Sequence, residues 1–76
     1  MAKPIEAVYV AFGARIRMIR ETLGLTQDEL AKKVELVRTS VVNIEAGRQR
    51  VLLDDVEKFA RGLGMSPKNL LKGIWW

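Results

Sequence analysis

Apolar residues recur every three to four positions along most of this 76-residue chain, which is the period of one face of an α-helix. The first such run starts at Ile5 and ends before Gly24, so the spacing predicts a helix over about 5–22. Pro4 suits the first turn of that helix. Its expected inward positions are Ile5, Val8, Phe12, Ile16, Ile19 and Leu23.

Capping signals and shorter apolar runs predict four further helices. Thr26 and Glu29 form a capping-box pattern before a second helix, Gln27 to Val34, and Ser66 with Pro67 starts a short fifth helix. A fourth helix ends at Gly64, and its expected inward positions are Leu53, Val56, Phe59, Ala60 and Leu63. With five helices and no strand, the chain is predicted to be all-α.

The third helix, about 38–46, has an unusual outer face. Val37, Val41 and Ile44 are expected to point inward. The opposite stripe combines hydrogen-bond donors, methyl groups and an amide, where a face that only needs solubility usually carries Lys and Glu. Its members are Arg38, Thr39, Val42 and Asn43. This composition indicates a face that contacts a partner.

Helices two and three are joined by a three-residue turn, Glu35 to Val37, as in a helix-turn-helix unit. That arrangement projects the second helix of the pair into the DNA major groove while the first crosses the backbone. Turn length alone is weak evidence, because many helical hairpins share it.

Charge and composition narrow the possible functions. The net charge is +4 and the pI is about 9.9, which favours an anionic partner. Residues 38–50 hold three arginines against Glu45, so they supply +2 of the +4. The chain has no Cys and no His, and the acidic cluster at 54–57 lies at a helix start, where the helix dipole favours it. We therefore expect no enzyme activity, metal, cofactor or small-molecule ligand. Among the other basic residues, we expect Arg15 and Arg17 to be solvating charges.

The stretches RIRMIRETLGLTQDELAKKVELVRTSVVNIEAGR and DDVEKFARGLGMSPKNLL resemble the Xre family, the class of phage Cro and repressor DNA-binding domains. The resemblance covers about residues 12–71. It implies a five-helix lambda-repressor-like fold in one domain, 1–76, with an N-terminal helix extension over 1–11 and a tail over 72–76. The chain departs from the family pattern at Glu35, where Gly is usual, and at Val37 and Leu52, where a polar helix cap is usual.

By this resemblance, Arg38, Thr39 and Asn43 occupy base-reading positions, and the methyls of Thr39 and Val42 suit a thymine methyl. Gln27 and Arg48 correspond to phosphate contacts, and Arg50 in the same basic loop is expected to join them. Arg20 and Glu45 occupy positions that form an ion pair between helices in the family.

The expected function is sequence-specific binding of double-stranded DNA by a prokaryotic transcription regulator, a repressor or a related type, acting as a homodimer on a pseudo-palindromic operator. Roles as a phage repressor, restriction–modification controller or antitoxin stay open. The alternative is a protein-interaction module of the same fold with weak DNA binding.

Trp75 and Trp76 are candidate dimer contacts, although they could also fold back on the chain's own core or fray. No targeting or membrane-spanning segment is evident, so we expect a cytoplasmic, nucleoid-associated protein.

Overall fold

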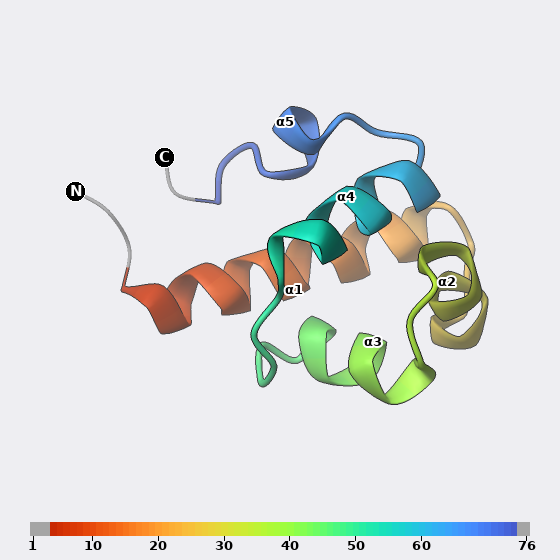
Figure 1. Cartoon of the computed structure of the whole chain (residues 1–76), viewed down its shortest axis with the longest axis horizontal. Coiled ribbons are helices and arrows are strands. Elements are labelled where there is room, and N and C mark those ends of the chain that lie inside the picture. The colour runs from red at the N-terminus through yellow and green to blue at the C-terminus, as the bar shows by residue number, and fades with distance from the viewer. Residues whose placement is uncertain (1–3, 75–76) are drawn as a thin grey trace.

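The computed structural model describes residues 4–74, and within that range it is all-helical with no strand. The prediction of an all-α fold is therefore confirmed. Figure 1 shows the long helix α1 running across the molecule, with α3 on one side of it and α5 on the other. The helices are α1 Ile5–Thr22, α2 Gln27–Val34, α3 Arg38–Glu45, α4 Leu53–Gly62 and α5 Pro67–Leu70.

One apolar core joins all five helices, because each contributes at least one residue that is almost inaccessible to water. Phe12 of α1 and Phe59 of α4 meet edge to face at its centre, with their ring centroids 5.8 Å apart. Ile74, beyond α5, is also buried and closes the C-terminal side of the core. The other buried apolar residues are Val8, Ile16, Leu30, Ala31, Val34, Val41, Ile44, Ala60, Leu63 and Leu70.

The helix starts follow the predicted caps. At α2, the Thr26 hydroxyl accepts a hydrogen bond from the Glu29 backbone N–H (3.0 Å), and the Glu29 carboxylate accepts one from the Thr26 N–H (2.8 Å). Together they satisfy two backbone donors that an uncapped helix start would leave free. The Ser66 hydroxyl caps α5 by accepting from the Asn69 N–H at 3.2 Å.

The turn between α2 and α3 contains a residue in the left-handed conformation. Glu35 has φ 59° and ψ 39°, and it is the one non-glycine residue with positive φ among residues 4–74. The N–H of Leu36 still closes the end of α2 by donating to the Ala31 carbonyl at 3.0 Å. Glu35 thus takes a conformation that Gly adopts readily, at a cost of about 1–2 kcal/mol for a residue with a Cβ.

Four inward predictions were wrong, and all four concern residues at or just outside a helix end. Leu53 is 89% exposed, Val37 68%, Leu23 53% and Ile5 51%. Ile5 is the first residue of α1 and Leu23 follows its last residue. Val37 is the residue before α3 and has an extended backbone (φ −79°, ψ 152°), so the helical period does not reach it; Leu36 packs on the core instead. Leu53 is the first residue of α4. Because helical side chains lean toward the N-terminus, its side chain projects past the helix end rather than onto the core.

The helices α1 and α3 approach at backbone distance through Gly13. A Cβ placed on Gly13 would lie 2.0 Å from the Ile44 carbonyl oxygen and 2.9 Å from that of Glu45. A side chain larger than hydrogen would therefore force the two helices apart.

Gly13→Ala should consequently lower the free energy of unfolding by at least about 1–3 kcal/mol, the usual cost of an overpacked core, despite the better helix propensity of Ala. Urea unfolding followed by circular dichroism measures this loss. Ala14→Ser is the matched control, because position 14 is exposed on the same helix. A Gly13→Ala protein as stable as the wild type would contradict the close approach.

Candidate nucleic-acid interface

The helix α3 presents the predicted stripe on the outside of the molecule. Arg38 and Thr39 are exposed, whereas Val41 and Ile44 on the opposite face are buried. Val42 and Asn43 are half-buried, so Val42 is less exposed than the pattern suggested. In Figure 1, α3 lies along one edge of the molecule, on the opposite side of α1 from α5. The stripe can therefore reach a partner without rearrangement of the core.

The pose of α3 is set by an ion pair to α1. The Arg20 guanidinium donates from Nε to Glu45 Oε2 at 2.6 Å and from Nη2 to Glu45 Oε1 at 3.0 Å. The two side chains are only 11% and 3% exposed. Arg20 also donates to the Leu25 carbonyl at 2.9 Å, so it ties the loop before α2 to the same point. The hydrogen bond from Arg20 to Glu45 raises the pKa of Arg20 above its ordinary value and keeps its charge fixed.

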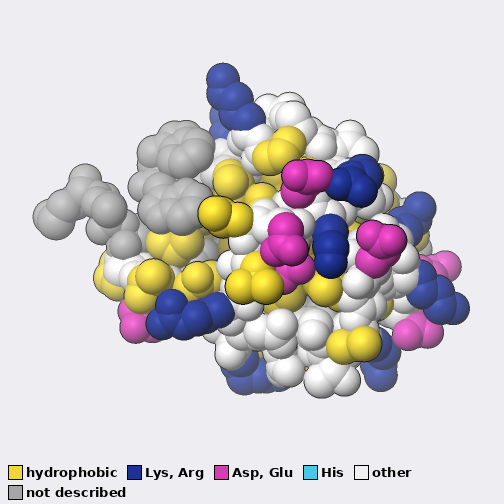
Figure 2. Space-filling model, in the orientation of Figure 1, with side chains coloured by type: hydrophobic (Ala, Val, Ile, Leu, Met, Phe, Trp, Pro, Cys, Tyr) yellow, Lys and Arg dark blue, Asp and Glu magenta, His cyan; other side chains and the backbone are white. Residues whose placement is uncertain are grey.

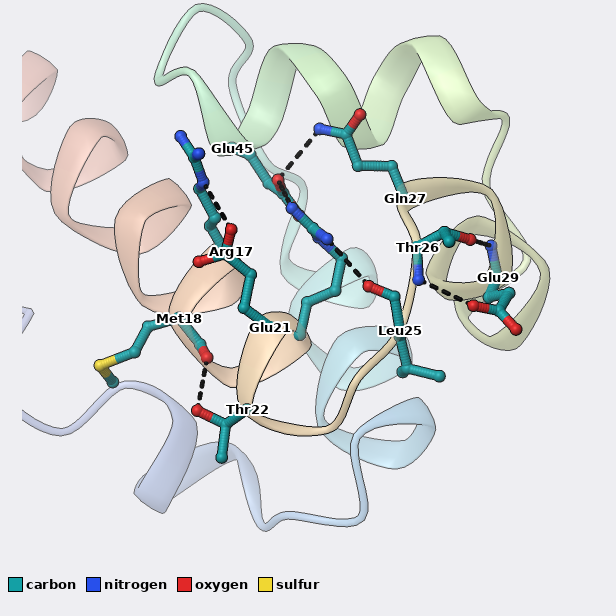
Figure 3. A network of polar contacts seen from close by, with 10 residues as sticks. Arg17, Met18, Glu21, Thr22, Leu25, Thr26, Gln27, Glu29 and Glu45 are labelled. Atoms are coloured by element: carbon teal, nitrogen blue, oxygen red, sulfur yellow. Dashed lines mark hydrogen bonds and ion pairs between the residues drawn. The ribbon is translucent and has the colours of Figure 1, made fainter.

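Gln27 joins this network rather than standing free. Its side-chain Nε2 donates to Glu45 Oε1 at 3.1 Å, and Figure 3 shows Gln27 of α2 and Glu45 of α3 pointing toward each other. Gln27 also lines an open hollow that it shares with Arg38. One N–H of the amide is therefore engaged with Glu45, and the second has no acceptor within residues 4–74.

The basic loop after α3 carries two arginines that form no ion pair within residues 4–74. Arg48 Nη2 donates to the Asn43 Oδ1 at 3.2 Å, which is a bond to a neutral group. The Arg50 guanidinium lies over the Tyr9 ring, 5.7 Å from its centroid. None of the ion pairs within residues 4–74 includes either arginine. The loop is consequently a place of net positive charge beside α3.

The contacts of Tyr9 and Arg15 were not predicted. Tyr9 falls between the inward positions of α1, so periodicity assigns it no role, and its contact with Arg50 spans 41 positions of the chain (50 − 9). Arg15 was expected to be a solvating charge, which was wrong: it donates to the carbonyls of Leu70 (3.1 Å) and Asn69 (2.9 Å) and holds the end of α5 against α1. Arg17 forms an exposed pair with Glu21 at 3.3 Å.

An apolar groove of about 300 Å³ lies away from the stripe, between the N-terminal half of α1 and the start of α4. Ile5 and Leu53, both exposed, form part of its rim. Figure 2 shows hydrophobic side chains gathered over the N-terminal part of α1, whereas acidic and basic side chains alternate over α4 and α2. The groove is lined by Ile5, Val8, Tyr9, Phe12, Val51, Leu53, Val56, Leu71 and Ile74.

Trp75 and Trp76 are beyond the described residues, so the structure does not test their role. No group of three or more potential metal-ligating side chains is found between residues 4 and 74. Over the same range, no helix combines the length and the apolar character needed to cross a membrane.

Comparison with known proteins matches residues 11–71 to a family described as the helix-turn-helix domain. The chain belongs to this family. Control protein C.BamHI of Bacillus amyloliquefaciens is 38% identical over 65 residues, or 84% of this chain and 80% of the relative. Control protein C.MunI of a Mycoplasma species is 32% identical over 88% of this chain and 92% of its own length.

Solved structures of helix-turn-helix proteins agree with the sequence comparison. The restriction–modification controller protein C.AhdI from Aeromonas hydrophila superposes with a TM-score of 0.84 and 35% identity, covering 90% of this chain and 99% of that one. The resemblance inferred from the sequence, and the fold that it implied, are therefore confirmed.

The Arg20–Glu45 pair predicts strong coupling in a double-mutant cycle. Either single alanine substitution leaves a poorly hydrated charge without its partner and should lower the free energy of unfolding by about 3 kcal/mol or more. The double variant should lose less than the sum of the two, with a coupling energy of about 1–3 kcal/mol in urea unfolding.

The exposed Arg17–Glu21 pair is the control for this cycle, since its coupling should stay at or below about 0.5 kcal/mol. Equal coupling energies for the two pairs would show that Arg20 and Glu45 are merely solvated charges.

Proposed function

We propose that this protein is a transcription regulator that binds double-stranded DNA sequence-specifically, with α3 in the major groove. One observation carries the proposal: an outward stripe with hydrogen-bond donors on a helix whose C-terminal end is tied to α1 and α2 through Glu45, bordered by two arginines that form no ion pair within residues 4–74. The related control proteins and transcriptional regulators favour this function over a protein-interaction module. They also favour restriction–modification control among the roles left open. For a DNA-bound regulator of this kind, we propose the nucleoid as the place of action.

In this arrangement, base recognition and phosphate contact are carried out by different residues. Arg38 has a planar fork that suits guanine O6 and N7, and the Thr39 methyl suits a thymine methyl. Asn43 suits adenine, and its amide is oriented by the bond that its oxygen accepts from Arg48. Gln27, Arg48 and Arg50 contact phosphates and fix the register of α3 on the duplex.

We further propose that the protein acts as a homodimer. One eight-residue helix reaches few base pairs, and two half-sites one helical turn apart provide the specificity that a regulator needs. The apolar groove is the candidate interface, because Leu53 on its rim is apolar and almost fully exposed. Ile74 lines the same groove. Because Trp75 and Trp76 follow Ile74 directly in the chain, we propose them as candidate contacts across the dimer.

Arg38→Ala and Arg48→Ala should separate base recognition from sequence-independent phosphate contact. Loss of Arg38 should cost about 1–3 kcal/mol on the best operator and little on random DNA, and should relax the preference at one base position in each half-site. Loss of Arg48 should weaken binding to all DNA sequences by the same factor. It should also reduce the slope of log affinity against log salt concentration by about one per monomer.

Binding titrations at several salt concentrations, on an operator selected from a random pool, measure both effects. Lys68→Ala is the control for charge alone, because Lys68 lies on α5, across α1 from α3. If Arg38→Ala weakens operator and random DNA equally, α3 is only a cationic surface and the proposed base reading is wrong.

Leu53→Glu should weaken dimerisation by at least tenfold, because the carboxylate would be buried without a partner at the interface. The monomer fold should survive, since position 53 is solvent-exposed and an acidic residue suits the first turn of α4. Analytical ultracentrifugation measures the dimer constant, with Met18→Glu as the control at an exposed apolar position outside the groove. An unchanged dimer constant for Leu53→Glu would place the interface elsewhere.

A further inference from the structure

Tyr9 connects the N-terminal part of α1 to the basic loop between α3 and α4. It precedes the region matched by the family model, residues 11–71, so the helix-turn-helix pattern assigns it nothing. Its ring is half-buried: one side borders the apolar groove beside Val51, and the Arg50 guanidinium lies over its face. The Tyr9 ring is thus held in place by its surroundings rather than free to move in solvent.

The loop is held against α1 on both sides of this contact. On one side Gly47, with φ +74°, approaches α1 so closely that an added Cβ would lie 2.8 Å from Val10 Cγ2 and 3.0 Å from Val10 Cα. On the other side Val51 lines the apolar groove and packs against the core. The backbone that carries Arg48 and Arg50 is therefore fixed relative to the first turns of α1.

The Arg50 guanidinium has no hydrogen-bond acceptor and no carboxylate partner within residues 4–74. Glu6 lines the same small hollow as Arg48 and Arg50, and it forms no ion pair in the described part of the chain. A cation–π contact is an attraction between the charge and the ring and uses none of the acceptors that the guanidinium N–H groups need, so the N–H groups of Arg50 that do not face the ring stay available. Those N–H groups match the oxygens of a phosphate.

We propose that Tyr9 is a positioning residue that holds Arg50 ready for a DNA phosphate, which makes the first turns of α1 part of the DNA-binding surface. The proposal rests on the proposed function, since it assumes that the loop meets DNA. The cation–π contact removes rotamer freedom from Arg50 before binding, so less conformational entropy is lost when the phosphate is bound.

The first experiment compares Tyr9→Phe, Tyr9→Leu, Arg50→Ala and the double variant Tyr9→Leu/Arg50→Ala in DNA binding. Tyr9→Leu should weaken binding by about two- to fivefold, the range of an exposed cation–π contact, whereas Tyr9→Phe keeps the ring and should bind like the wild type. Arg50→Ala should lower the salt slope by about one per monomer. Adding Tyr9→Leu to Arg50→Ala should cause no further loss.

Two outcomes would overturn the proposal. A loss for Tyr9→Phe as large as that for Tyr9→Leu would mean that the hydroxyl contacts DNA itself. An equal loss for Tyr9→Leu with and without Arg50 would mean that Tyr9 acts only through the fold, and circular dichroism melting of each variant reports that contribution separately.

A second experiment needs no DNA. In the free protein, the Arg50 side-chain δ protons should show an upfield ring-current shift in NMR spectra, which Tyr9→Phe retains and Tyr9→Leu removes. Absence of that shift overturns the positioning role whatever the DNA results. A normal shift in a protein that binds no DNA in the first experiment would instead reject the proposed function, and with it the phosphate role of Arg50.

Discussion

The carboxylate of Glu45 is the point on which the arrangement of helices depends. It lies in the last turn of α3, where the helix dipole disfavours a negative charge, and its side chain is almost completely buried. Such a group is stable only with full hydrogen bonding. Arg20 of α1 supplies two donors and Gln27 of α2 a third, so the same carboxylate joins all three helices that surround the proposed DNA-binding surface. The electrostatic cost of burying Glu45 is thus offset by interactions that also define the angle of α3.

Much of the fold could be predicted because local rules determine it. The bounds of α1 and α2 follow from apolar spacing and from the capping box at Thr26, and the structure has the same bounds. The rules failed at element ends. Val37 and Leu53 obey the period in the sequence, but a period does not reveal where a helix begins. Val37 precedes α3 and Leu53 is the first residue of α4, so neither side chain is directed onto the core.

The candidate site was predictable in its membership and less so in its connections. The stripe on α3 and the Arg20–Glu45 pair could be named from the sequence and its resemblance. The bond from Arg48 to Asn43, the bond from Gln27 to Glu45 and the cation–π contact of Arg50 with Tyr9 could not. Each of these depends on how a loop or a helix end is placed by the core, and neither spacing nor composition carries that information.

The backbone contact at Gly13 has a consequence for how new specificities arise. Because α3 rests on α1 through main-chain atoms and through Val41 and Ile44, its orientation does not depend on the length or chemistry of the outward side chains. Arg38 and Thr39 can therefore be exchanged without moving the scaffold that presents them. Such a scaffold permits operator preference to diverge by a few substitutions while the energetics of folding stay nearly constant, which separates evolution of the recognised sequence from evolution of the fold.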